Sequence, residues 1–472
     1  MSETAQPTEP DQPWAELAAW GREPRLSELD ALMWRTDRHP EGSWSGVVIH
    51  LLDREPDWDR LRAGHRWFLR VVPRFTQKVV EPAVPVGAPM WADDPSFDLD
   101  YHLRRVRIPG PGSRQQLLEL AQSIGLTPLD RSRPPWESTL VEGLKDGRAA
   151  YVMHAHHVFM DGMALALLHK NALSPIRQSR GEKPAAPPRP PTRLGPTAVA
   201  AAELNRQMLG GPRAAGDLTA GLVRSLRAPS TALRYARSLT RVAGPPPANH
   251  SKILRGGRQR QWRFGLLECE LTELRRAGKT IDATVNDCFV SALLGGLRRY
   301  CAAFGEDLSD VPISMPVALR RPDEALGGNK FAGAFFLVPS SISDPAERTR
   351  ELHRRVDQVR GEPALDFLGN LTPLLNRTPS GVAAAILGSI GGAVLTTSSW
   401  PGIRQERYMA GAKFERMFVF APLPGTAMTS ALCTHNGICC IGINADGDVF
   451  SDLDLLWRCL DDGLAEILAL GN

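Results

Sequence analysis

The sequence predicts an α/β protein made of two α/β sandwich lobes. Strand-like and helix-like segments are mixed in both halves of the 472-residue chain, which is typical of such sandwiches. The length suits two or three domain-sized lobes, and a proline-rich stretch separates the halves. We therefore expect a first lobe over residues 14–182, a linker or helical crossover over 183–257, and a second lobe over 258–472.

The first half alternates helical and extended patterns. Helices are predicted where apolar residues recur close to helical spacing: Leu26 to Trp34, Trp58 to Val71 and Gln115 to Ile124. Trp44 to Leu52 and Asp98 to Ile108 are predicted as strands. A hairpin follows, from Trp136 to Leu144 and from Arg148 to His156, because an Asp-Gly pair at the joint of two extended runs is a strong hairpin signal. The residues from Gly162 to Leu173 are mostly good helix formers.

A basic segment follows the proline-rich stretch between Glu182 and Pro196, which polyproline geometry would stiffen. Residues 197–241 contain seven arginines against only Glu203 and Asp217. One interpretation is a solvated helix over the seam between the lobes. The other is an amphipathic helix on an anionic membrane, although Pro229 interrupts it.

The second half of the chain also contains both strand-like and helix-like segments. Strands are predicted at Gln261 to Leu267, Val311 to Ala318, Lys330 to Val338 and between Phe414 and Ile443. Helices are predicted at Leu271 to Ala277, from Thr284 to about Tyr300, at Pro345 to Arg360 and at Asp452 to Leu468.

Composition excludes several classes of protein. A formal net charge of +4 gives no reason to expect nucleic acid. The seven cysteines lie between Cys269 and Cys459 without framework or zinc-site spacing, which indicates reduced thiols of a cytoplasmic protein and no metal site. The first residues lack a signal-peptide pattern. The longest apolar run, Gly381 to Leu395, is shorter than the roughly 20 residues that span a bilayer, so we expect no transmembrane helix.

The most informative stretch is His156-His157-Val158-Phe159-Met160-Asp161-Gly162, between the second hairpin strand and the helix that follows. A neutral imidazole can take a proton from a hydroxyl, amine or thiol near neutral pH. A lone histidine is more often packed for structural reasons. Asp161 alone could be a helix N-cap. The conjunction of two histidines, a carboxylate and a glycine at one strand-to-helix turn is far more specific than its parts and favours chemistry.

This stretch matches the His-His-x-x-x-Asp-Gly signature of acyltransferases that share the chloramphenicol acetyltransferase-like fold. Within that group the chain resembles the bacterial wax ester synthase/diacylglycerol acyltransferase family. The resemblance also rests on Pro128 to Glu137 ahead of the hairpin, on Asn286-Asp287, and on Ser314 to Arg320 followed by Gly328-Asn329. It covers the chain from about Leu26 to Leu468.

The resemblance implies two lobes with a channel between them, acyl-CoA as co-substrate, a hydroxyl acceptor such as a long-chain alcohol or diacylglycerol, and no cofactor. It implies that His157 is the general base, that Asp161 holds the turn, that His156 is a positioning neighbour and that Gly162 leaves room for the thioester. Three further residues are implied as substrate-binding residues: Asn286, Asp287 and Asn329. Asn286 is also a candidate oxyanion donor, although a helix-start role suits it equally.

The chain departs from the family pattern at two places. Ser398-Ser399-Trp400-Pro401-Gly402 replaces Ser-Asn-Val-Pro-Gly, and Thr434-His435 replaces a Ser-Tyr pair. Both changes bear on the acceptor.

Two other classes share features of the motif. A condensation-type enzyme would form an amide from a carrier-bound thioester or act on a specialised-metabolite acceptor, and a non-catalytic homologue would only bind acyl-CoA or lipid. The Asp-Phe-Gly-Trp-Gly element of the plant-type acyltransferases is absent from the sequence.

Overall fold

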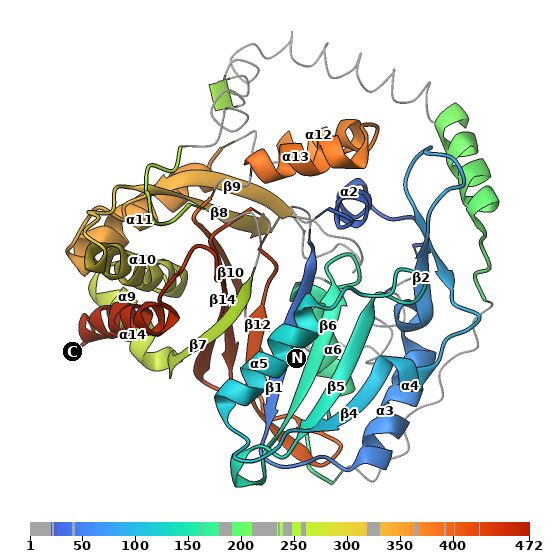
Figure 1. The fold of residues 1–472 in the computed structure, drawn as a ribbon, viewed down its shortest axis with the longest axis horizontal. Helices are drawn as coiled ribbons and strands as arrows, with labels where there is room; N and C mark the ends of the chain where they lie inside the picture. The colour runs from blue at the N-terminus through green and yellow to red at the C-terminus, as the bar shows by residue number, and fades with distance from the viewer. Residues whose placement is uncertain are drawn as a thin grey trace, which may run out of the picture.

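The computed structural model describes residues 20, 23–39, 43–160, 162–178, 191–209, 234, 237–238, 248–255, 261–318, 331–362, 367–390, 393–400, 402–423 and 425–472. Two lobes lie side by side, each built around a six-stranded sheet with helices packed on it (Figure 1). The predicted α/β architecture of two lobes is confirmed.

The sheet of the first lobe has the order β11-β12-β1-β6-β5-β4. Its strands are β11 (Tyr408–Met409), β12 (Ala412–Phe420), β1 (Ser45–Leu52), β6 (Ala149–His156), β5 (Trp136–Glu142) and β4 (Leu103–Arg107). Neighbours are antiparallel except β4 and β5. The predicted hairpin is present: Asp146 and Gly147 adopt the left-handed conformation (φ 63° and 70°) that lets the chain reverse between β5 and β6.

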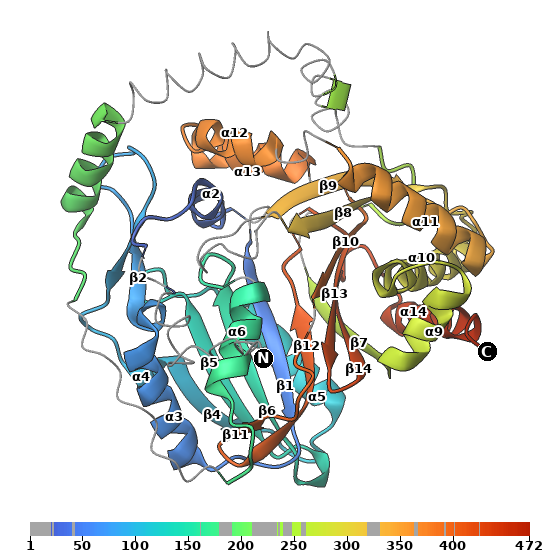
Figure 2. The same ribbon diagram turned by 180° about the vertical axis from the view of Figure 1, so that it is seen from behind.

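Helices cover both faces of this sheet. Figure 2 shows α3 (Trp58–Val71), α4 (Leu99–His102) and α6 (Gly162–Ala172) on one face, and α5 (Arg114–Leu126) lies on the other. The helix α3 matches its predicted bounds because Asp57 caps its first turn and its apolar residues recur on one side. A small sheet of β2 (Gln77–Val80) and β3 (Met90–Asp93) extends the lobe.

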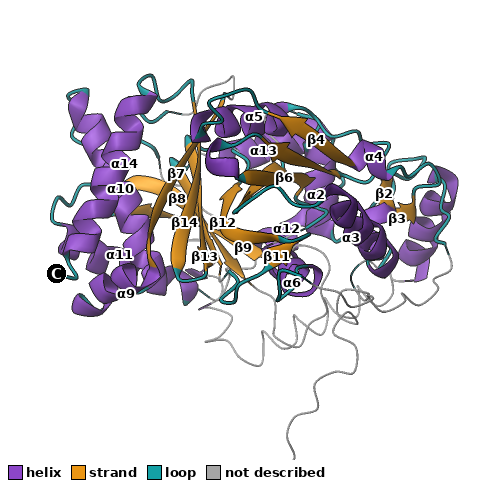
Figure 3. Ribbon diagram, turned by 90° about the horizontal axis from the view of Figure 1, so that it is seen from below, coloured by secondary structure: helices purple, strands orange, loops and turns teal. Residues whose placement is uncertain are grey.

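The sheet of the second lobe has the order β7-β14-β13-β10-β8-β9. Its strands are β7 (Trp262–Glu270), β14 (Ile438–Asp446), β13 (Met428–His435), β10 (Leu395–Trp400), β8 (Val311–Ala318) and β9 (Phe331–Val338). The helices α9 (Leu271–Thr280), α10 (Val285–Ala303), α11 (Pro345–Arg360) and α14 (Leu453–Ala469) form a layer on its outer face (Figure 3). The core of this lobe lies between that layer and the sheet.

The lobes are joined by strand β12, which follows β10 in the chain but pairs with β1 of the first lobe. Buried side chains of β1, α5, β7 and β12 form one apolar cluster between the lobes. Gly442 of β14 must be a glycine because a Cβ there would overlap the carbonyl oxygen of Val419 in β12. The seam is therefore a packed interior over this part of its length.

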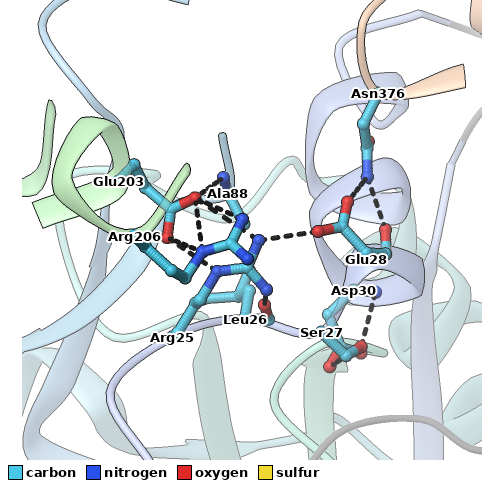
Figure 4. A network of polar contacts seen from close by, with 9 residues as sticks. All are labelled: Arg25, Leu26, Ser27, Glu28, Asp30, Ala88, Glu203, Arg206 and Asn376. Atoms are coloured by element: carbon cyan, nitrogen blue, oxygen red, sulfur yellow. Dashed lines mark hydrogen bonds and ion pairs between the residues drawn. The ribbon is translucent and has the colours of Figure 1, made fainter. Parts of the chain in front are cut away.

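A second junction lies at α2 (Glu28–Thr36), which contacts α12 (Phe367–Leu375) and α13 (Ser380–Ile390) from the C-terminal half. Leu32, Leu375 and Ala383 are buried together there. Figure 4 shows the polar network beside it, in which Asn376 donates to the Glu28 carboxylate over 2.9 Å. Arg25 donates to Glu28 over 2.6 Å and to Glu203 over 2.7 Å.

One local expectation is wrong. The stretch from Asp98 to Ile108, predicted as one strand, begins with the short helix α4 because the Asp98 carboxylate caps the N–H of Asp100. The apolar run from Gly381 to Leu395 is divided between α13 and the start of β10. Among the described residues, the helices are all too short or too polar to cross a membrane.

Candidate active site

The His-His stretch forms a tight turn at the end of strand β6. The N–H of Phe159 donates to the carbonyl of His156 over 2.9 Å, which closes the turn around His157. The N–H of His157 donates over 2.8 Å to the carbonyl of Trp44, the residue before β1. His157 is half-buried, and Gly162, the first residue of α6, is exposed. His156, His157 and Gly162 therefore lie at one strand-to-helix turn.

The ring of His156 lies between the turn and Asp37. Its Nδ1 accepts the N–H of Val158 over 3.1 Å. Nε2 lies 3.5 Å from Oδ1 of Asp37, and the same oxygen accepts the N–H of Trp44 over 2.9 Å. The side chain of His156 is 2% exposed. Its ring holds the turn and does not face an open site.

Asp37 is kept ionised by its neighbours. Burial by itself raises the pKa of this carboxyl, but the contact with His156, the N–H of Trp44 and the charge of Arg131 lower the pKa below its usual value. The guanidinium of Arg131 lies 3.7 Å from Oδ2 of Asp37 and 3.7 Å from the centre of the Trp34 ring. It also donates to Glu81 over 3.1 Å.

The second lobe contributes Trp400, the last residue of β10, to this site. A Cβ on Gly162 would lie 3.9 Å from the Trp400 indole, and Trp400 packs against the apolar cluster of the first lobe. The chain beyond it is tightly held: a Cβ on Gly402 would overlap the carbonyl oxygen of Thr434, whose hydroxyl accepts the N–H of Gly402 over 3.2 Å. The departure from the family pattern therefore places an indole beside the predicted catalytic turn.

Other histidines of the first lobe are sealed in its interior. Burial, with the nearby His156, lowers the pKa of His154 to about 4. His50 and His169 face each other with their Nε2 atoms 2.8 Å apart, and burial lowers the pKa of His50 to about 3. These rings stay neutral and lie away from solvent, whereas His157 keeps solvent access.

Asn286 and Asp287 lie at the start of α10 in the second lobe. The carboxylate of Asp287 accepts the N–H of Thr284 over 2.9 Å, and the Thr284 hydroxyl accepts the N–H of Asp287 over 3.2 Å, which makes a capping box. The same carboxylate contacts Nδ1 of His353 over 2.7 Å. Asn286 is half-buried, and its amide nitrogen lies 3.9 Å from the sulfur of Met315 in β8. Asp287 thus has a structural role at the helix start.

Two predicted site residues, Asp161 and Asn329, lie outside the described residues. The residues that sequence reasoning missed are Asp37 and Trp44. Trp400 was noted only as part of a departure that bears on the acceptor, and Arg131 lies in the stretch that carries the resemblance but was given no role. No local pattern points to Asp37, which closes helix α2 far from the motif in sequence. Within the described ranges, no group of histidines, cysteines and carboxylates could hold a metal ion.

Two mixed lobes, in which β11 and β12 from the C-terminal half join the first sheet, with a half-buried histidine in a His-His-x-x-x-Asp-Gly stretch at their seam, are the features of two-lobed acyltransferases. Solved structures support the fold. The structure superposes on the wax ester synthase/diacylglycerol acyltransferase from Marinobacter aquaeolei VT8 with a TM-score of 0.64 and 20% sequence identity. The match covers 95% of this chain and 100% of that one. It has a TM-score of 0.61 on the first condensation domain of the calcium-dependent antibiotic synthetase, at 16% identity, with 95% of this chain and 96% of that domain covered. Both likenesses show the fold.

Sequence comparison gives the family. Residues 26–289 match the wax ester synthase/diacylglycerol acyltransferase catalytic domain, and residues 327–468 match the C-terminal domain of the same family. A Mycobacterium tuberculosis protein assigned by name to the diacylglycerol O-acyltransferases is 36% identical over 97% of this chain and 95% of its own. The chain belongs to the wax ester synthase/diacylglycerol acyltransferase family and is an acyl-CoA-dependent acyltransferase.

Proposed function

We propose that the protein transfers an acyl group from acyl-CoA to the hydroxyl of a long-chain alcohol or a diacylglycerol, giving a wax ester or a triacylglycerol, with His157 as the general base. One observation carries the proposal: His157 is half-buried and keeps solvent access at the seam of the lobes, while its neighbour His156 is 2% exposed and accepts the N–H of Val158 at Nδ1.

The chemistry needs one base and no covalent acyl-enzyme. The imidazole of His157 takes the proton of the acceptor hydroxyl, and the resulting alkoxide attacks the thioester carbonyl. The tetrahedral intermediate then expels the CoA thiolate, which takes its proton from the imidazolium. General base catalysis of this kind contributes roughly 10²- to 10⁴-fold to the rate.

The other motif residues support that step. Asp161 holds the turn, and the absence of a side chain at Gly162 leaves room for the thioester. Asn286 and Asn329 are proposed substrate contacts from the second lobe, with Asn286 a candidate donor to the oxyanion. Asp287 acts there through the helix that presents Asn286, because its own carboxylate caps α10. We place the lobe limits at 14–182 and 258–472, with 183–257 as crossover and with β11 and β12 returning to the first sheet.

The test is an acceptor screen with palmitoyl-CoA as donor, read as release of free CoA thiol. Hexadecanol and dipalmitoylglycerol should both be offered. We expect His157→Ala to lower the rate by at least 10²-fold. The exposed His250 supplies the matched control, since His250→Ala should leave the rate unchanged. Unchanged transfer by His157→Ala would show that His157 is not the base.

A second candidate function is acyl transfer to an amine or to a specialised-metabolite acceptor. The likeness to a condensation domain favours it, since that domain has the same fold with a comparable TM-score. The same screen separates the two functions when hexadecylamine and an acyl-carrier thioester are added as acceptor and donor. If the enzyme prefers the amine acceptor and the carrier-bound donor, the proposed substrates change from an alcohol and acyl-CoA to an amine and a carrier-bound thioester.

We also infer that the crossover over residues 197–241 contacts an anionic membrane or lipid surface. Helical residues 196–209 are docked by Glu203, whose buried carboxylate accepts bonds from Arg25 and Arg206 (Figure 4). The opposite side leaves Leu204, Met208 and Leu209 exposed, by 45%, 78% and 68%. Apolar side chains beside a run of arginines suit the interface of a membrane.

Sedimentation with anionic vesicles tests this contact. The first variant reverses the charges of Arg224, Arg227, Arg234 and Arg237, and the second replaces Met208 and Leu209 by serine. Both should reduce binding, whereas neutral vesicles should bind wild type poorly. Equal sedimentation of wild type and both variants would exclude the contact. The seven reduced, buried cysteines support a cytoplasmic location for such a peripheral protein.

A further inference from the structure

Asp37 contacts the catalytic turn from both of its sides. Through Oδ1 it accepts the N–H of Trp44, and the carbonyl of Trp44 in turn accepts the N–H of His157 over 2.8 Å. The same oxygen faces Nε2 of His156, whose Nδ1 accepts the N–H of Val158. One carboxylate therefore holds Trp44, whose carbonyl anchors His157, and contacts His156, which in turn accepts the N–H of Val158.

The position of Asp37 is itself fixed. Its own N–H donates to the carbonyl of Met33 over 3.0 Å at the end of α2, so the carboxylate is carried by a helix end and not by a free loop. Arg131 approaches the second carboxylate oxygen and is held against the Trp34 ring and Glu81. The side chain of Asp37 is 21% exposed, so water competes little for these contacts.

We propose that Asp37 is a positioning residue for the base His157, acting through Trp44 and His156, with Arg131 beside its second carboxylate oxygen. The proposal rests on the proposed function, since it assumes that His157 is the base. A displacement of about 1 Å at a reacting group costs on the order of 10²-fold in rate. Loss of the carboxylate should therefore reduce kcat while leaving the substrate sites, and hence KM, unchanged.

The test compares Asp37→Ala and Asp37→Asn with a matched carboxylate at the opposite end of β1. Asp53 also accepts a backbone N–H, that of Lys413 over 2.6 Å, and a bond from an arginine, Arg177 over 2.7 Å. We expect Asp37→Ala to lower kcat 10- to 100-fold with both KM values within twofold of wild type. Asp37→Asn keeps the acceptor oxygen and should recover part of this loss, whereas Asp53→Ala should keep kcat.

Each outcome decides between the claims. If His157→Ala abolishes transfer but Asp37→Ala keeps kcat, the positioning role is wrong and the proposed function stands. If kcat falls equally in Asp37→Ala and Asp53→Ala, in proportion to the folded fraction seen by circular dichroism, the role is only structural. If His157→Ala leaves transfer unchanged, the proposed function fails first.

A second and independent inference concerns Trp400. Its half-buried indole reaches from the second lobe to within contact distance of exposed Gly162, five residues beyond His157. The chain just after this strand end is held against Thr434, whose hydroxyl accepts the N–H of Gly402 over 3.2 Å. We infer that Trp400 is a specificity residue that limits the bulk of the groups beside the reacting carbonyl.

The experiment offers primary and secondary long-chain alcohols, and straight and 2-methyl-branched acyl-CoA donors, to Trp400→Val. Pockets discriminate added carbons by roughly 10- to 200-fold, so at least one ratio of kcat/KM should shift about tenfold toward the bulkier substrate. Trp457 also lies against a glycine, Gly265, but in the outer helical layer, and Trp457→Val should leave both ratios unchanged. If Trp400→Val changes neither ratio by more than twofold, the assignment is wrong.

Discussion

Acid should destabilise this protein through histidines that are folded in their neutral form, and His154 is the one best suited to a quantitative test. Its ring is 1% exposed, and burial lowers its pKa from 6.5 to about 4. In the unfolded chain the same ring protonates below about pH 6.5. Between these two pKa values the unfolded state binds more protons, so the free energy of unfolding falls as the pH falls from 6.5 towards 4.

The magnitude follows from the two pKa values. At pH 5 the unfolded ring is about 1.5 pH units below its pKa, and each unit is worth about 1.4 kcal/mol, so His154 should destabilise the fold by about 2 kcal/mol. His102 has a pKa of about 4 and His50 of about 3, both lowered first by burial, so each should contribute a similar amount. The total of about 6 kcal/mol is a large part of a typical stability of 5–15 kcal/mol.

The assay is urea unfolding at pH 7.5 and at pH 5.0, followed by tryptophan fluorescence. His154→Leu removes one titrating ring, so the loss of unfolding free energy between the two pH values should be smaller than in wild type by about 2 kcal/mol. The exposed His250 again provides the control, because His250→Leu should keep the wild-type difference. An identical pH difference in wild type and His154→Leu would refute the reasoning.

Three further predictions concern the junctions between segments. Gly442→Ala should destabilise the protein by more than about 2 kcal/mol, because the new methyl group overlaps the carbonyl of Val419. This loss is measured as a lower urea midpoint, and an unchanged midpoint would mean that β12 can move away from β14. Glu203→Ala leaves the Arg25 guanidinium without a buried carboxylate, so it should lower the free energy of unfolding by about 3 kcal/mol and speed proteolysis of the crossover. An unaltered cleavage rate would show that the helix docks without this pair. Leu32→Ala, which empties the contact of α2 with α12 and α13, should cost about 2–5 kcal/mol in urea unfolding; a cost below about 1 kcal/mol would show that this junction adds little.

Sequence patterns predicted the elements whose signals are local. The helix α11 has its predicted bounds because Asp344 caps it and Pro345 occupies its first turn. The helices α12 and α13 were not predicted, because α12 has Pro373 in its interior and α13 is apolar on most sides. Strand β12 could be seen as extended, but its pairing with β1 joins residues far apart in sequence, and alternation carries no information about a partner.

In the candidate site too, features with a local sequence signal were predicted and features that depend on tertiary packing were not. The turn with His157 was predicted because a motif and its strand-to-helix context are contiguous. Asp37 was not predicted as a member of the site, because it reaches the turn only through tertiary packing and a C-capping aspartate has an ordinary local explanation. Trp400 was noted as part of a departure from the family pattern that bears on the acceptor, but its place beside Gly162 also depends on tertiary packing.

The pairing of β12 with β1 also sets the order of folding during synthesis. The first sheet needs residues 412–420 beside β1, and β12 enters the ribosomal exit tunnel only after most of the second lobe has been translated. The N-terminal lobe therefore holds an open edge at β1 through most of translation, although domains generally fold in the order of their synthesis. Unpaired strand edges invite association with other chains, so nascent chains of this protein should need a chaperone until β12 closes the sheet.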